Sequence, residues 1–259
     1  MDLALEGKII IVSGGARGIG EGITNLLAAE NAIPIIIGRS EEDNLALVKA
    51  IQMLGYQADH VVAELTEPAA CENAIKNIVA KFGKIDGLVN NAGENDSIGL
   101  EKGNYEFFMK SLHKNLVHYY LLAHHALPYL KKSKGSIVNI NSKTAETGQG
   151  GTSAYAAANG GRNALTREWA VELLPFGIRV NAVVVAECFT PLYEKWLQAL
   201  PNPEEKLKSI KAKIPLGQRF TTKEEIANTV AFLLSEKSSH TTGQLIHVDG
   251  GYVHLDRAL

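Results

Sequence analysis

Short apolar segments rich in β-branched residues alternate along the chain with longer segments in which apolar residues recur at helical spacing. The short segments lack the apolar–polar alternation of a half-exposed strand, which is typical of parallel strands covered on both faces. Seven strands are predicted, at residues 8–12, 33–37, 60–62, 85–89, 136–140, 178–184 and 244–248. Helices are predicted between them, at 19–30, 41–54, 68–82, 104–131, 153–174 and 223–235. This alternation predicts one α/β domain over residues 1–259, a doubly wound seven-stranded parallel sheet.

Residues 187–222, between the sixth strand and the last helix, form an insertion. It is too long for an ordinary strand-to-helix loop of about 2–6 residues. Because α/β sheets bind ligands at the carboxyl ends of their strands, we interpret this insertion as a small substrate lid. We expect it to contain short helices at 192–200 and 203–212. A structural excursion or a contact between subunits is the alternative.

Composition excludes several classes of protein. With 46% hydrophobic and 21% charged residues the chain is neither disordered nor collagen-like. Its 26 basic and 28 acidic residues provide no basic domain for a nucleic acid. No apolar segment approaches the ~18 residues of a membrane span, and no signal peptide pattern opens the chain. Because Cys71 and Cys188 are isolated, we expect reduced thiols and a cytoplasmic protein without a nucleic-acid or membrane partner.

A glycine-rich segment follows the first predicted strand and precedes the first predicted helix. Gly14, Gly18 and Gly20 allow positive φ angles and a close approach of the backbone to a ligand. The helix start at Gly18, Ile19 and Gly20 offers free N–H groups to an anion. The segment lacks the Gly-Lys-Ser/Thr sequence of P-loop NTPases. In this position, the glycines predict that the pyrophosphate of a dinucleotide binds here.

The end of the second strand bears on the choice between NAD and NADP. NAD sites usually carry Asp or Glu there, whereas this chain has Arg39. Arg39 and Arg17 together would hold a 2′-phosphate, so we favour NADP, with NAD as the alternative. Arg39 as a solvated surface residue is the competing interpretation. Glu41 and Glu42 nearby would weaken phosphate binding.

Further motifs occur in a definite order along the chain. They are the glycine segment, Asn90-Asn91-Ala92-Gly93, Asn115, Ser142, Tyr155 and the closing Val248-Asp249-Gly250-Gly251. Together these motifs resemble those of the short-chain dehydrogenase/reductase family over essentially the whole chain. The resemblance implies a Rossmann-type fold, a nicotinamide cofactor and an oxidoreductase acting on CH–OH donors.

The resemblance also implies roles for individual residues. Tyr155 would be the general acid/base, and Ser142 would bind the substrate oxygen by a hydrogen bond. Asn115 would support a proton-relay water. A strand-end cap and a half-buried helix tyrosine are the alternatives for Ser142 and Tyr155. The cofactor would be contacted by Glu64, Leu65, Asn90, Ala92, Gly93 and, at the nicotinamide amide or diphosphate, Thr190.

The chain departs from the family motif Tyr-x-x-x-Lys, because Asn159 follows Tyr155 at this spacing. The family's lysine binds the nicotinamide ribose, and its charge favours the ionised tyrosine. Asn159 would retain hydrogen bonds to the ribose but carries no charge, so we expect cofactor binding to survive better than turnover. Arg162 and Lys143 are candidates to supply the missing charge. Surface or packing roles are the alternative for both.

Several other segments look like those of bacterial L-fucose dehydrogenases. They are residues 96–100, 115–120, 142–145, 166–170, 190–193 and 254–259. Glu187 stands in a second departure, where the family commonly has Pro-Gly after the sixth strand. Besides Ser142 and Tyr155, the loop residues Glu94, Asn95, Gln149 and Glu187 offer hydrogen bonds to a sugar; each is otherwise a solvated loop residue.

The leading hypothesis is an NAD(P)-dependent dehydrogenase that oxidises an aldose such as L-fucose to its lactone, impaired by the loss of the lysine. Another alcohol or ketone substrate, of 3-oxoacyl or steroid type, is the first alternative. A catalytically silent dinucleotide-binding protein is the second. The resemblance also implies a homotetramer built on the helices at 104–131 and 153–174 and the last strand.

The eight histidines raise the question of a metal site. His118 with the pair His124-His125 suggests such a site most, but no ligand motif of the His-x-x-x-His or Cys/His kind appears. Surface or packing histidines are the better interpretation, so no metal is predicted.

Overall fold

The computed structural model describes residues 2–255, in which seven parallel strands form one sheet in the order β3-β2-β1-β4-β5-β6-β7. The strands are β1 (Ile9–Ser13), β2 (Ile33–Gly38), β3 (Asp59–Val62), β4 (Gly87–Asn90), β5 (Ser136–Ser142), β6 (Arg179–Val185) and β7 (Leu245–Val248). All seven predicted strands are confirmed, with small shifts of their ends. The strand order reverses between β1 and β4, and ligands of such sheets bind at the carboxyl ends beside this point.

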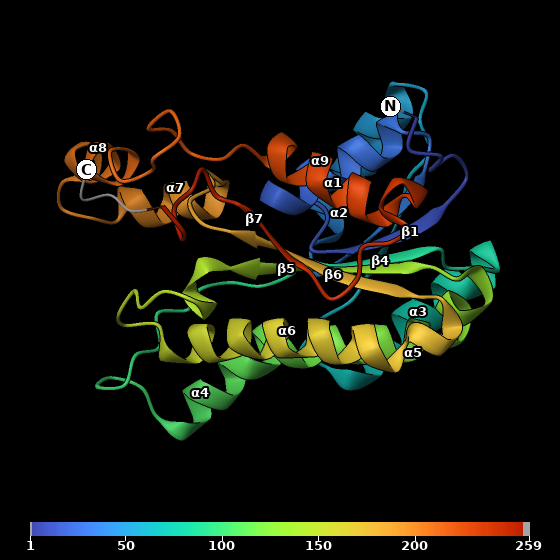
Figure 1. Cartoon of the computed structure of the whole chain (residues 1–259), viewed down its shortest axis with the longest axis horizontal. Helices are drawn as coiled ribbons and strands as arrows, with labels where there is room; N and C mark the ends of the chain where they lie inside the picture. Colours follow the sequence, from blue (N-terminus) through green and yellow to red (C-terminus); the bar gives the residue numbers. More distant parts are fainter. Residues whose placement is uncertain (1, 256–259) are drawn as a thin grey trace.

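Helices cover both faces of the sheet (Figure 1). They are α1 (Gly18–Ala29), α2 (Glu41–Met53), α3 (Pro68–Phe82), α4 (Tyr105–Leu112), α5 (His118–Ser133), α6 (Ser153–Glu172), α7 (Pro191–Gln198), α8 (Pro203–Lys211) and α9 (Lys223–Leu234). Figure 1 shows α1, α2 and α9 on one face and α3, α5 and α6 on the other. None of the helices within residues 2–255 combines the length and apolarity needed to cross a membrane.

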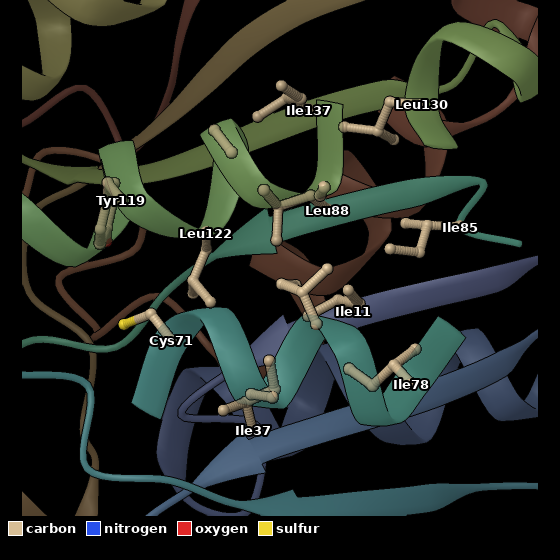
Figure 2. Close-up of a cluster of buried hydrophobic side chains, with 14 of the residues drawn as sticks. Ile11, Ile37, Cys71, Ile78, Ile85, Leu88, Tyr119, Leu122, Leu130 and Ile137 are labelled. Atoms are coloured by element: carbon tan, nitrogen blue, oxygen red, sulfur yellow. The ribbon is translucent and has the colours of Figure 1, made fainter. Parts of the chain in front are cut away.

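Successive residues of each central strand enter different hydrophobic cores. Ile9 and Ile11 of β1 pack with residues of α3 and α5, whereas Ile10 and Val12 pack with residues of α1 and α9. Figure 2 shows the first of these cores, with Leu122 of α5 facing the strands. Since both faces of β1 are covered, all of its positions are apolar and the sequence shows no alternation.

The helix predicted at 104–131 is interrupted. A π-helical turn, His113–Val117, separates α4 from α5 and contains Asn115. This segment has no Pro or Gly, so the apolar period continues through it and the sequence pattern does not reveal the break. Such turns are frequent at functional sites because they redirect a side chain without ending the helix.

The insertion at 187–222 folds into the two short helices expected for it, α7 and α8. Figure 1 places both beyond the end of β6 from which the insertion departs. The insertion therefore lies at the carboxyl end of the sheet, where the glycine segment and the residues after β4 and β5 also lie.

Candidate active site

The glycine segment after β1 is a tight turn that other residues would not fit. Gly14 and Gly18 have φ angles of 64° and 57°, in the left-handed region that favours glycine. A Cβ on Gly20 would overlap the carbonyl oxygen of Gly14, and a Cβ on Gly14 would lie 3.0 Å from Cα of Ala92. The turn is therefore packed against the segment that follows β4.

The turn leads directly into α1, whose N-terminus has no side-chain cap from Arg17. The N–H groups of Gly18, Ile19 and Gly20 have no carbonyl group within the helix to bind. Free N–H groups and the positive end of the helix dipole attract an anion. The arrangement fits the pyrophosphate of a dinucleotide.

Ser13 and Asn91 hold the glycine turn in place, a role that the sequence analysis did not assign. The amide nitrogen of Asn91 donates to the carbonyl oxygens of Ser13 (2.9 Å) and Gly14 (3.2 Å). The backbone N–H groups of Asn91 and Ala92 donate to Ser13 Oγ, at 2.9 and 3.1 Å. The Asn-Asn pair was visible in the sequence, but which of the two faces the turn was not.

Asn90, in contrast, points into the sheet. It is fully buried and donates to Asn139 Oδ1 at 3.0 Å. Its side chain therefore joins β4 to β5, and only its backbone borders the predicted cofactor surface.

The two arginines expected at a 2′-phosphate differ in their surroundings. Arg17 lies in an ion pair with Asp43 of α2 at 2.6 Å. Hydrogen bonds from Ser40 and then from Arg17 lower the pKa of the Asp43 carboxyl. Arg39 is exposed just after β2, and the structure shows no ion pair for it among residues 2–255. Arg39 is thus the more available of the two cations.

The segment after β3 offers mainly backbone to a ligand. The Leu65 side chain is buried in the core beneath the sheet. The Glu64 carboxylate accepts hydrogen bonds from the N–H (3.1 Å) and the hydroxyl (2.9 Å) of Thr66. These contacts engage the Glu64 carboxylate within its own turn, so the backbone of Glu64 and Leu65 is what this segment offers to a ligand.

Ser142 and Tyr155 belong to neighbouring elements. Ser142 ends β5, and its Oγ accepts a 3.3 Å hydrogen bond from the N–H of Thr144. Tyr155 lies in the first turn of α6, which packs against the short turn 143–145 that follows Ser142. Both side chains are half-buried. The cap predicted as an alternative for Ser142 is present, and it leaves the hydroxyl hydrogen free to donate.

Asn115 joins three elements from the π-helical turn. Its side-chain oxygen accepts from the N–H of Glu94 (2.7 Å), and its amide nitrogen donates to Ser111 Oγ (3.3 Å). Its carbonyl oxygen accepts from Arg162 Nε at 2.6 Å. Asn115 is fully buried, and both its side-chain oxygen and its side-chain nitrogen form hydrogen bonds. It therefore holds the loop after β4 in position through Glu94.

Asn159 is fully buried on the same helix as Tyr155. Its amide nitrogen donates to the carbonyl oxygen of Tyr155 (2.8 Å), and its side-chain oxygen accepts from Arg162 Nη1 (3.1 Å). A hydrogen bond from Asn159 to a ribose, as expected from the sequence, would compete with these two contacts.

Arg162 is a buried cation behind the candidate catalytic residues. It is 3% exposed, so of the surface and packing roles given as its alternatives only the packing role fits. Besides Asn115 and Asn159, it binds the carbonyl oxygen of Ile140 (3.1 Å), and its guanidinium lies 4.2 Å from the centre of the Tyr119 ring. Nη2 finds no hydrogen-bond partner, and no carboxylate pairs with Arg162, within residues 2–255.

The pKa of the Tyr119 hydroxyl is affected by its burial and by the two neighbouring groups Arg162 and Tyr155. Burial raises the pKa of its hydroxyl well above the usual range, the Arg162 charge opposes that rise, and Tyr155 adds to it. The three groups therefore act on one another. A negative charge that forms beside them is favoured by the unpaired guanidinium.

Lys143 and Glu187 form an almost completely buried ion pair between the ends of β5 and β6. Lys143 Nζ also lies 4.0 Å from the centre of the Tyr252 ring. Burial, followed by the charge of Glu187 and a hydrogen bond with it, raises the pKa of Tyr193 above its usual range. The charge of Lys143 is neutralised by Glu187, whereas Arg162 has no carboxylate partner among residues 2–255. Arg162 is therefore the better candidate to replace the charge of the family's lysine.

The predicted substrate residues lie in separate places. Gln149 lines a pocket of about 390 Å³ formed by residues 144–153 and Ala156. The Glu94 carboxylate lies 3.8 Å from the ammonium group of Lys114 in the π-helical turn. Asn95 is exposed, and its side-chain oxygen accepts a hydrogen bond from the N–H of Ser97. The pocket lining does not include Glu94, Asn95 or Glu187.

Thr190 connects the lid to the glycine turn. Its Oγ1 caps α7 by accepting from the N–H of Tyr193 at 3.2 Å. Its methyl group lies 3.2 Å from the position of a Cβ on Gly18. The start of the lid thus borders the predicted pyrophosphate position.

Comparison with known proteins agrees with this geometry. A family model described as enoyl-(acyl carrier protein) reductase matches residues 14–253. The chain is 37% identical over 253 residues to the 3-oxoacyl-[acyl-carrier-protein] reductase FabG of Thermotoga maritima, covering 97% of this chain and 100% of that protein. It is 30% identical over 252 residues to the L-fucose dehydrogenase of Bos taurus, covering 97% of this chain and 91% of that protein.

Solved structures are similar over the whole chain. The structure of Cj0485 dehydrogenase superposes with a TM-score of 0.94 at 49% identity, covering 100% of this chain and 99% of that one. The aldohexose dehydrogenase of Thermoplasma acidophilum has a TM-score of 0.88 at 30% identity, covering 98% and 97%.

Proposed function

Since the chain belongs to the short-chain dehydrogenase/reductase family, we propose that it is an NADP-dependent oxidoreductase for an aldose of L-fucose type. The observation that carries the proposal is the position of Ser142 and Tyr155 at the carboxyl end of the sheet that also carries the uncapped N-terminus of α1. A pyrophosphate at α1 directs the rest of a dinucleotide along this edge towards the two hydroxyls.

The chain's own residues account for most of the reaction. The bound nicotinamide supplies the acceptor for the hydride that leaves the anomeric carbon. Ser142 donates a hydrogen bond to the anomeric oxygen, and Tyr155 takes the proton of that hydroxyl group. Loss of the hydride and the proton converts the closed aldose into its lactone.

Arg162 compensates for the missing lysine in this proposal. Its unpaired, buried charge lies one helical turn beyond Asn159, and Asn159 accepts a hydrogen bond from Arg162 while donating one to the backbone carbonyl of Tyr155. A fixed cation in a region of low dielectric constant favours the negative charge that develops on the reacting oxygens. The proposal is therefore of a working dehydrogenase, with the silent dinucleotide-binding protein as the outcome that would contradict it.

Arg39 supports NADP as the cofactor, because an exposed arginine without an ion pair among the described residues is free to bind a 2′-phosphate. The aldose substrate is supported by two sugar dehydrogenases among the similar proteins. A 3-oxoacyl thioester is the second candidate, favoured by the 37% identity with FabG over its full length.

One experiment separates these candidates. The unmodified protein is incubated with L-fucose, other aldoses or the 3-oxoacyl probe acetoacetyl-CoA, each with NAD(H) or NADP(H), and nicotinamide absorbance is followed from pH 6 to 10. NADP reduction by a sugar supports the proposal, and turnover of acetoacetyl-CoA alone favours the second candidate. Cofactor binding without turnover of any substrate identifies a silent protein.

A further inference from the structure

Three metal-ligating side chains meet on the side of the sheet occupied by β7. They are Glu146, in the loop after β5, His247 in β7 and His254 in the segment that follows β7. One potential ligand atom from each lies within 4.8 Å of the other two. Glu146 and His247 are 101 residues apart, so no sequence spacing announces the group.

The two histidines and the glutamate are already oriented towards one another. His247 Nε2 lies 2.9 Å from Glu146 Oε2. The imidazole rings of His247 and His254 meet edge to face, with centroids 4.4 Å apart and an interplanar angle of 90°. The His247 and Glu146 side chains are 18% and 24% exposed, so the pair lies at the surface and is partly shielded from solvent.

Residues outside the cluster fix two of its members. The other oxygen of Glu146 accepts a 3.4 Å hydrogen bond from the amide of Asn163, which in turn accepts from Asn141. Both asparagines are buried. His247 is held by strand pairing, opposite Val184 of β6. Hydrogen bonds of this kind orient ligating carboxylates in metal sites, and here they leave Glu146 Oε2 directed at the histidines.

We propose that Glu146, His247 and His254 bind one divalent transition-metal ion of the zinc type, with water completing the coordination. Two imidazoles and one carboxylate suit Zn²⁺, whereas Mg²⁺ and Ca²⁺ prefer oxygen ligands throughout. Ligand distances of about 2.0–2.2 Å require the three side chains to draw slightly closer together. His254 is exposed and lies beyond the last strand, so it can make this movement.

The ion would connect the C-terminal segment to the loop that forms the 144–153 pocket, since Glu146 also lines that pocket. The proposal does not depend on the nature of the substrate, because the site contains neither Ser142 nor Tyr155.

Metal binding is tested on the full chain, with any affinity tag removed and bound metals stripped by EDTA and dialysis. Isothermal titration with ZnCl₂ is expected to show one ion per chain. His254→Ala and Glu146→Gln should each weaken zinc affinity at least tenfold. His240→Ala removes an exposed histidine outside the cluster and should leave zinc affinity unchanged. MgCl₂ should produce no saturable heat.

A second readout identifies the ligands. Co²⁺ at the same site should give visible d–d absorption that His254→Ala alters, with unfolding temperatures confirming that each variant is folded. The proposal is overturned if zinc does not bind at one ion per chain. It is equally overturned if the cluster variants bind zinc as tightly as the His240→Ala control.

Discussion

At the scale of single residues, the candidate active site depends on three side chains of one helix. Tyr155, Asn159 and Arg162 lie on one face of α6, and the asparagine amide donates to the backbone carbonyl of Tyr155 and accepts from the Arg162 guanidinium. Asn159 thus lies between Tyr155 and the Arg162 cation. The family's lysine would stand at the position of Asn159, three residues before Arg162. Asn159 and Arg162 are joined by a hydrogen bond, so we expect a substitution at one position to change the effect of a substitution at the other.

We predict that Asn159→Lys alone destabilises the protein, because it places a second buried cation against Arg162. The free energy of unfolding should fall by roughly 1–3 kcal/mol or more, the cost of an unsatisfied buried polar group. Arg162→Leu alone should lower turnover roughly ten- to hundredfold. The double variant Asn159→Lys/Arg162→Leu should regain both stability and turnover, since the family's lysine then acts without a competing charge.

Urea unfolding and turnover across pH on the four proteins check this coupling, and Arg162→Lys tests whether a cation of another shape suffices. Additive effects in the double variant would show that the two positions are independent. A stable and more active Asn159→Lys single variant would show that Arg162 does not supply the charge.

Arg39 is the residue on which the preference for NADP rests. We predict that Arg39→Asp weakens NADP binding roughly tenfold or more, because a charge-assisted hydrogen bond to phosphate is lost. The new carboxylate accepts hydrogen bonds from a ribose, so NAD binding should strengthen. Quenching of intrinsic fluorescence during titration measures both affinities. Arg17→Ala, whose parent side chain is engaged with Asp43, should have the smaller effect; tighter binding of NAD than NADP by the unmodified protein would contradict the prediction.

At the scale of elements, the ends of β5 and β6 are joined by the pair Lys143–Glu187. The two side chains are 8% and 12% exposed, so neither charge is solvated if the other is removed. The pair explains why a glutamate is tolerated where the family commonly has Pro-Gly. It also holds the start of the lid, since Glu187 binds Tyr193 of α7.

We predict that Glu187→Gln lowers the free energy of unfolding by about 3–5 kcal/mol, because it leaves Lys143 buried without a counter-charge. The double variant Lys143→Met/Glu187→Leu should be more stable than Glu187→Gln, since no charge is then buried. Urea unfolding monitored by circular dichroism measures both. Glu72→Gln breaks the exposed pair with Lys76 and is the control, expected to change stability little. Equal, small effects of Glu187→Gln and Glu72→Gln would mean that the buried pair is solvated.

At the scale of the whole molecule, the two helix layers leave apolar side chains on the outer surface. Phe107 of α4, Tyr120 of α5 and Val171 of α6 are exposed. Exposed apolar surface of this kind is often covered by a second subunit. The homotetramer expected from the family resemblance, in which these helices pack against their copies, stays a prediction.

We predict a mass of about 112 kDa in solution, four chains of 28.0 kDa, by size-exclusion chromatography with light scattering. Tyr120→Glu places a charge on the outer helix layer and should shift the protein towards smaller species without unfolding it. A monomer of 28.0 kDa at micromolar concentration would contradict the prediction.

Several features follow from the sequence because their causes are local. The strands and most of the helices follow from apolar periodicity, which depends on neighbours a few residues away. The glycine turn follows from sterics that only Gly14, Gly18 and Gly20 satisfy. The family motifs then place Ser142 and Tyr155 at the carboxyl end of the sheet, because their elements and order are set along the chain.

Other features were decided only by the tertiary structure. Whether Arg162 is a surface residue or a buried cation depends on Asn115 and Ile140, which reach it from other elements. The π-helical turn at Asn115 contains no helix-breaking residue and packs against α6, a contact that the local sequence does not reveal. The convergence of Glu146 and His247 requires β7 to pair beside β6, a contact between parts of the chain 101 residues apart. Local sequence determines which elements form, whereas the side chains that meet between them depend on the sheet order and on packing across layers.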